Sequence, residues 1–181
     1  MPSARPQRHR RYKALETINL VTSVLHQAFV VAVWCMAGLA LWRGAGPEKA
    51  SALTLFLLLF IDDVYHLVFG PYYPLQTADP WHVFLDTAAL VSFVAIALRA
   101  NRFYPLVLAA AQLVSVIAHM VRIGLAEMTS LSYYLLYVMP FYFEVLILAG
   151  GLWRHHQRSR RIGPYREWRG TVTRSPPRPV T

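Results

Sequence analysis

The chain has 181 residues, of which 56% are hydrophobic and 15% are charged, with a net charge of +9 and a single cysteine. The hydrophobic residues form long runs instead of the spaced pattern of a soluble helical bundle, so the composition excludes an ordinary soluble domain. One cysteine, Cys35, excludes a disulfide within the chain. No nucleic-acid-reading motif accompanies the basic charge, so nucleic acid is not expected as a partner.

Five apolar segments follow one another, at residues 17–42, 52–69, 82–98, 104–123 and 130–153. About 20 apolar residues of helix cross a bilayer, and helices are the form that satisfies the backbone in lipid. The sequence therefore predicts an all-α integral membrane helical bundle with a four-helix core and an additional N-terminal apolar helix. We expect three regions: a basic tail at 1–16, the bundle at 17–153, and a basic, disordered tail at 154–181 that is rich in arginine and proline.

The lysines and arginines predict the orientation of the bundle. Five lie in the N-terminal tail and eight follow Trp153. If all five segments span with the N-terminus outside, twelve basic residues are inside and six are outside. If segment 17–42 does not span, seventeen basic residues are inside and one is outside. The positive-inside rule favours the second version, whereas the uncharged length of 17–42 favours a full span. Both versions predict a cytoplasmic C-terminus in a bacterial inner membrane.

Ionisable residues interrupt the apolar segments near their predicted outer ends. At 1.5 Å per residue they lie at similar depths, and some share helix faces at i,i+4, such as Asp62 with His66 and His82 with Asp86. The sequence thus predicts one outward-facing polar cluster, made of Asp62, Asp63, His66, His82, Asp86, His119 and Arg122.

Several roles are open to this cluster. It can be structural, with Arg122, aspartates and histidines pairing inside a short bundle. It can bind a divalent metal through Asp62, His66, Asp86 and His119, or it can carry protons. Haem between His66 and His119, or His26, is a weaker alternative, and no cofactor is required.

A second polar pair is predicted deeper in the bundle. Gln112 lies eight residues and Glu144 nine residues from the predicted inner ends of their segments, so their depths are similar. A hydrogen bond between them is the expected arrangement, because buried polar groups in membranes pair with one another.

The stretch "DTAALVSFVAIALRANRFYPLVLAAAQLVSVIAHMVR", residues 86–122, resembles small inner-membrane proteins of alphaproteobacteria, especially sphingomonads. The likeness extends more loosely over residues 52–158. It implies a four-helix membrane core and brings no activity or site residue with it.

The expected function is therefore general. We expect an accessory or structural subunit, or a small binding protein, of the membrane. A metal- or proton-dependent membrane enzyme or transporter that uses the cluster is the alternative. The expected partners are the lipid bilayer, a larger membrane complex or a second copy of the chain, and anionic lipid at the basic tails.

Overall fold

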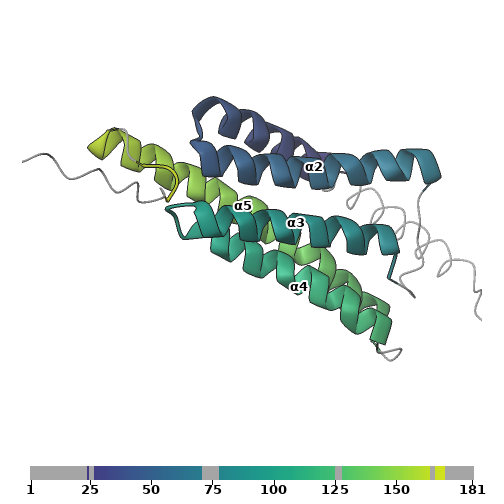
Figure 1. Cartoon of the computed structure of the whole chain (residues 1–181). Helices are drawn as coiled ribbons and strands as arrows, with labels where there is room; N and C mark the ends of the chain where they lie inside the picture. Colours follow the sequence, from purple (N-terminus) through teal and green to yellow (C-terminus); the bar gives the residue numbers. More distant parts are fainter. Residues whose placement is uncertain (1–23, 25–26, 71–77, 125–127, 164–165, 170–181) are drawn as a thin grey trace, which may run out of the picture.

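The computed structural model describes residues 24, 27–70, 78–124, 128–163 and 166–169. It contains an N-terminal helix, Gln27–Arg43, followed by α2 (Gly46–Phe69), α3 (Pro80–Arg99), α4 (Tyr104–Gly124) and α5 (Ser130–Ile162) (Figure 1). The helices α2 to α5 are each long and apolar enough to cross a membrane. The predicted all-α bundle, with a four-helix core and an extra N-terminal helix, is confirmed.

Local sequence signals explain where the helices begin and end. Asp79 caps α3 by accepting a hydrogen bond from the Trp81 backbone N–H at 2.9 Å, and Pro80 follows in the first turn, where a missing N–H costs nothing. The hydroxyl of Thr129 caps α5 in the same way. At the other end, Gly70 stops α2 with a φ of 83°, a conformation that side-chain-bearing residues rarely adopt.

The four long helices form a closed ring. Each packs on the next in the chain, and α5 returns to contact α2. Their buried side chains include Leu55, Phe93, Leu108 and Leu148, one from each helix. Large apolar side chains such as Leu98, Leu113 and Leu146 point outward instead. Only 17–33% of the most apolar stretch of each helix is buried, so the outer surface requires an apolar solvent such as lipid.

The N-terminal helix packs along the outside of this ring. The Phe29 ring lies 5.3 Å from that of Phe141 on α5, and Trp34 lies 4.8 Å from Phe56 on α2. Its 17 described residues measure about 26 Å, slightly less than a bilayer core. Residues 17–23, 25 and 26 of the predicted segment lie outside the described residues, so a full span remains a prediction.

The C-terminal region differs from the expected disordered tail. Helix α5 continues past Trp153 to Ile162, and residues 166–169 return to the bundle. The Arg169 backbone N–H donates to the Arg99 carbonyl at 2.7 Å, and Trp168 lies against the backbone of Gly46. The reason is that Trp168 supplies apolar surface for this end of the bundle, although the neighbouring residues are basic. The predicted N-terminal tail and residues 170–181 lie outside the described part.

Gly151 permits close packing between α4 and α5, and this gives a first prediction. A Cβ at Gly151 would lie 2.9–3.1 Å from the Tyr104 ring, whereas one at Gly150 would meet nothing within 4 Å. Gly151→Ala should destabilise the bundle by about 1–3 kcal/mol through overpacking, measured as thermal unfolding in detergent. Gly150→Ala is the control, because it has the same helix-propensity gain without the contact. Equal stability of the two variants would contradict the packing.

Candidate metal centre

Three metal-ligand side chains meet at the end of the bundle where α2 ends and α3 begins. Asp62 and His66 come from one face of α2, and His82 comes from the first turn of α3. Within the described ranges, this is the one group of three or more His, Cys, Asp or Glu side chains with metal-ligand spacing. The cap at Asp79 and the i,i+4 spacing on α2 are what bring these side chains together.

The three ligand atoms form a nearly regular triangle. His82 Nε2 lies 3.1 Å from Asp62 Oδ1, His66 Nε2 lies 3.7 Å from the same oxygen, and the two Nε2 atoms are 3.3 Å apart. Ligands of a tetrahedral zinc ion with bonds of about 2.0–2.1 Å are separated by about 3.4 Å. The triangle therefore fits three corners of a tetrahedral metal site.

The outer nitrogens of both histidines face acceptors. His66 Nδ1 donates to the Gly70 carbonyl at 3.4 Å, and His82 Nδ1 lies 3.1 Å from Asp79 Oδ2. Contacts of this kind orient metal-binding histidines, because a proton held on Nδ1 leaves the lone pair on Nε2. In this tautomer the two Nε2 lone pairs and the Asp62 oxygen lie close together, with 3.1–3.7 Å between the atoms. A bound cation would stabilise this arrangement, as would a proton on His82 between Asp62 and Asp79.

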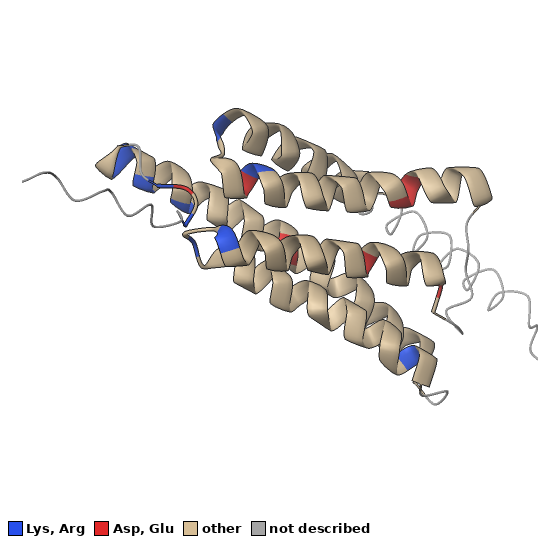
Figure 2. Ribbon diagram, in the orientation of Figure 1, with Lys and Arg blue, Asp and Glu red and all other residues tan. Residues whose placement is uncertain are grey.

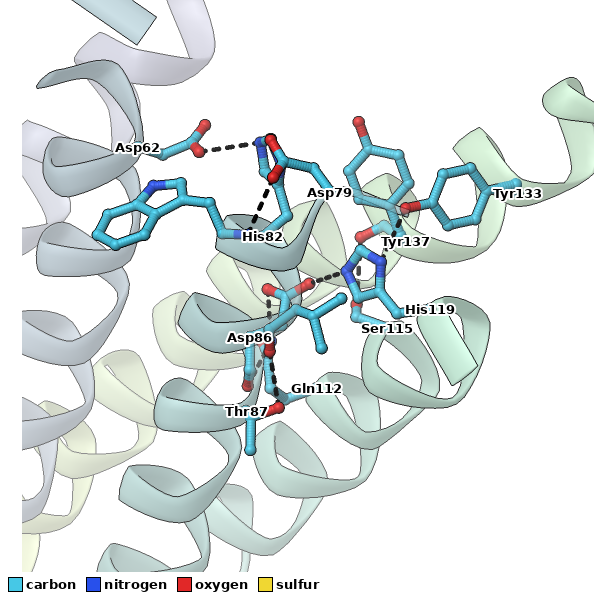
Figure 3. Close-up of polar contacts among 12 residues, drawn as sticks. Asp62, Asp79, His82, Asp86, Thr87, Gln112, Ser115, His119, Tyr133 and Tyr137 are labelled. Carbon is cyan, nitrogen blue, oxygen red and sulfur yellow. Dashed lines mark hydrogen bonds and ion pairs between the residues drawn. The ribbon is translucent and has the colours of Figure 1, made fainter. Parts of the chain in front are cut away.

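The contact between Asp62 and His82 agrees with this assignment. Although the two atoms are 3.1 Å apart, Asp62 Oδ1 receives no hydrogen bond of acceptable direction among the described residues. Figure 3 shows His82 between Asp62 and Asp79, each within ion-pair distance of one ring nitrogen. Asp79 thus serves two purposes, because Oδ1 caps α3 and Oδ2 faces His82.

The three ligands line a half-open cavity of about 250 Å³ between the helices, called here the central cavity. Asp86, Gln112 and Ser115 are also in its wall, and the remainder is apolar and aromatic, with Phe29, Leu58 and Phe141 among the lining residues. A metal ion on the triangle would thus have its fourth coordination position near a cavity, which is the arrangement of catalytic and transport sites and not of closed structural ones.

A second polar network lies deeper, between α3, α4 and α5. His119 is fully buried, with Nε2 at 2.7 Å from Asp86 Oδ2 and Nδ1 at 2.8 Å from the Tyr133 hydroxyl. Gln112 donates to the other Asp86 oxygen at 2.9 Å (Figure 3). Each polar side chain in this network has a partner, as buried groups require.

The predicted cluster therefore divides into two parts. The predicted metal set of Asp62, His66, Asp86 and His119 is wrong in its membership, because His82 joins Asp62 and His66 while Asp86 pairs with His119. These residues lie at one end of the bundle because their depths are similar. Which of them contact one another depends on how each helix is rotated about its axis.

Two other members of the predicted cluster lie outside both groups. Asp63 is exposed. Arg122 donates to the Met128 carbonyl and lies 5.5 Å from the centre of the Tyr133 ring. Arg122 thus anchors the segment before α5, a structural role of the kind expected for part of the cluster.

The prediction of a hydrogen bond between Gln112 and Glu144 is also wrong. Both side chains are buried, but the Gln112 amide donates to the carboxylate and the carbonyl of Asp86. Neither carboxyl oxygen of Glu144 has a hydrogen-bond partner among the described residues.

For haem, the geometry at His119 is unsuitable, because both of its ring nitrogens already have partners, Asp86 and Tyr133. An axial ligand needs one free ring nitrogen. His26, the other histidine considered for this role, lies outside the described residues.

Sequence reasoning missed Asp79. The signal that could have found it is the stretch Asp79-Pro80, since an aspartate directly before a proline at a helix start is a typical cap. Had α3 been started there, Asp79 and His82 would have shared its first turn at i,i+3.

Fold and site together define a class: a multi-helix bundle with four candidate membrane-spanning helices and an Asp-His-His group beside a half-open cavity. Comparison of the chain with protein-family models, with curated proteins and with solved structures gave no match.

Proposed function

We propose that this chain is a small polytopic membrane protein that binds a divalent metal ion, with Zn²⁺ as the best fit, through Asp62, His66 and His82. The observation that carries the proposal is the triangle of ligand atoms, with sides of 3.1, 3.3 and 3.7 Å, whose two histidines both face acceptors through Nδ1. One carboxylate and two imidazoles are ligands that zinc, iron and manganese accept, and tetrahedral spacing favours zinc.

The orientation belongs to the same proposal. Arg43, Lys49, Arg99, Arg102 and the α5 arginines lie at the end opposite the metal group, where Figure 2 shows most of the blue ribbon. By the positive-inside rule this basic end faces the cytoplasm. The C-terminus is then cytoplasmic, and in a bacterial inner membrane the metal group faces outward.

The test is a metal titration of the full chain, purified in mild detergent and freed of metal with a chelator. We expect one Zn²⁺ per chain at saturation, with tighter binding than Mg²⁺ or Ca²⁺, which prefer oxygen ligands. A chain that binds no zinc at micromolar free concentration would overturn the proposal.

A second candidate function is a metal- or proton-dependent membrane enzyme or transporter. It is favoured by one observation, namely that the wall of the central cavity contains Asp86 as well as the three metal ligands. Through His119, Asp86 is linked to the Tyr133 hydroxyl, so a continuous polar path leads from the cavity to the first turn of α5. Such paths of aspartate and histidine carry protons in membranes.

The role of an accessory or structural subunit remains a prediction. In that case the metal would fix the end of α2 against the start of α3, because the ligands come from these two helices and residues 71–77 lie between them. Zinc binding would then raise the stability of the bundle without any turnover.

A further inference from the structure

A second cavity lies at the basic end of the bundle, far along the helices from the metal group. It has a volume of about 750 Å³ and is bounded by the start of α4 and the last turns of α5. Its charged wall contains Arg102, Arg154, His155, Arg158 and Arg161. We propose that this basic cavity binds the phosphate headgroup of an anionic phospholipid of the membrane, independently of any metal.

The charge of the wall is strongly one-sided. Arg154, Arg158 and Arg161 follow the spacing i, i+4, i+7, which places them on one face of α5. The wall contains no acidic side chain, and the nearby Glu48 is bonded to Arg102. Arg154 and Arg161 therefore add positive charge to the cavity, and guanidinium groups suit phosphate because they donate in a fixed, planar pattern.

The start of α4 adds to this attraction. Residues Asn101 to Tyr104 line the cavity where α4 begins. The first turn of a helix presents the positive end of the helix dipole, and this end favours a bound anion.

An apolar wall continues from the charged one, and this indicates a lipid instead of a soluble phosphate. Val107 on α4 and Ile147 on α5 line the cavity towards the interior of the bundle, with Phe103 and Ile162 at its edge. Val107 and Ile147 lie on the bilayer side of the arginines, so they can contact an acyl chain. A basic pocket between membrane helices on the cytoplasmic side is a typical site for anionic lipid headgroups.

Exposed tryptophans place the cavity at the depth of the headgroups. Trp42 lies in the last turn of the N-terminal helix, and Trp153 immediately precedes Arg154 on α5. Both indoles are largely exposed. Tryptophan gathers at the membrane–water interface, so the arginines that follow Trp153 along α5 lie at the level of lipid phosphates.

The experiment uses the delipidated full chain in neutral detergent, titrated with phosphatidylglycerol or phosphatidylcholine of identical acyl chains. We expect phosphatidylglycerol to bind more tightly. The double variant Arg154→Gln/Arg161→Gln should weaken that binding about thirtyfold, which corresponds to about 1 kcal/mol for each arginine near anionic lipid. The matched control, Arg43→Gln/Arg160→Gln, removes two charges from the same end but outside the cavity wall, and should have little effect.

A charge-neutral variant tests the cavity itself. A side chain on Gly150, which lines the cavity, meets nothing within 4 Å of its Cβ, so Gly150→Leu should fold and occupy the space. It should weaken phosphatidylglycerol binding, whereas Gly38→Leu, at an equally open position, should not. Equal affinity for the two lipids, equal losses in the two double variants, or displacement of the lipid by millimolar inorganic phosphate would each overturn the proposal.

Discussion

Replacing Asp62 with Asn should lower the affinity of the chain for Zn²⁺ by more than about a hundredfold, because it removes the single carboxylate of the ligand triangle. This loss should exceed the 10–100-fold that changes to the second layer of a metal site typically cost. His66→Gln and His82→Gln should have effects of the same order, since each removes one of the other two corners. Competition with a zinc-sensitive dye of known affinity measures all three.

The chain contains matched controls for this experiment. Asp63 is the sequence neighbour of Asp62 and carries the same charge at the same depth, but it is outside the ligand group. Asp63→Asn should therefore leave zinc affinity nearly unchanged. If Asp62→Asn and Asp63→Asn weakened binding equally, the effect would be one of general charge and the assigned ligands would be wrong.

Asp79→Asn gives an intermediate result in the same series. Asparagine caps helices as well as aspartate does, so α3 should still begin at Pro80. What the variant loses is the carboxylate that lies 3.1 Å from His82 Nδ1. We expect zinc affinity to fall by about 10–100-fold with the fold unchanged.

The second large effect concerns the stability of the basic end. Glu48 on α2 is fully buried and accepts a hydrogen bond from Arg102, whose side chain is 8% exposed. Arg102→Met should destabilise the bundle by about 3–5 kcal/mol, because it leaves a buried carboxylate without its counter-charge. Thermal or denaturant unfolding in detergent provides the measurement.

A double variant distinguishes the effect of an unpaired buried charge from the effect of losing the whole ion pair. Glu48→Gln/Arg102→Met removes both charges and should recover much of the lost stability, since replacing a whole buried ion pair is often nearly neutral. Arg99→Met, a change at an exposed position at the end of α3, should alter stability by no more than about 0.5 kcal/mol. If Arg102→Met were as mild as Arg99→Met, the ion pair would not hold this end together.

The fold was predictable because membrane helices are specified by length and hydropathy. Each of the four long helices contains the whole apolar segment expected for it. The main differences are at the ends. Helix α2 begins at Gly46 and not at 52, because Pro47 starts a first turn and Glu48 finds a partner in Arg102. Sequence alone showed Glu48 as a charge in a connection, with no sign of burial.

The sequence predicted how deep the ionisable residues of the site lie along their helices, but not which of them contact one another. Counting residues from the helix ends placed Asp62, His66, His82, Asp86 and His119 at one end of the bundle, and the structure has them there. Which of them meet depends on how each helix is rotated about its axis. That rotation is fixed by packing of side chains such as Phe93 and Leu108, which a list of depths does not contain. Hence His119 faces Asp86 instead of His66.

The most direct test of the metal centre is X-ray absorption at the zinc edge on the full chain loaded with one equivalent of Zn²⁺. We expect a four-coordinate ion with two imidazole nitrogens at about 2.0–2.1 Å and oxygen in the remaining positions. In Asp62→Asn the same spectrum should change, and in Asp63→Asn it should not. A six-coordinate, all-oxygen shell without imidazole scattering would contradict the assignment of His66 and His82 as ligands.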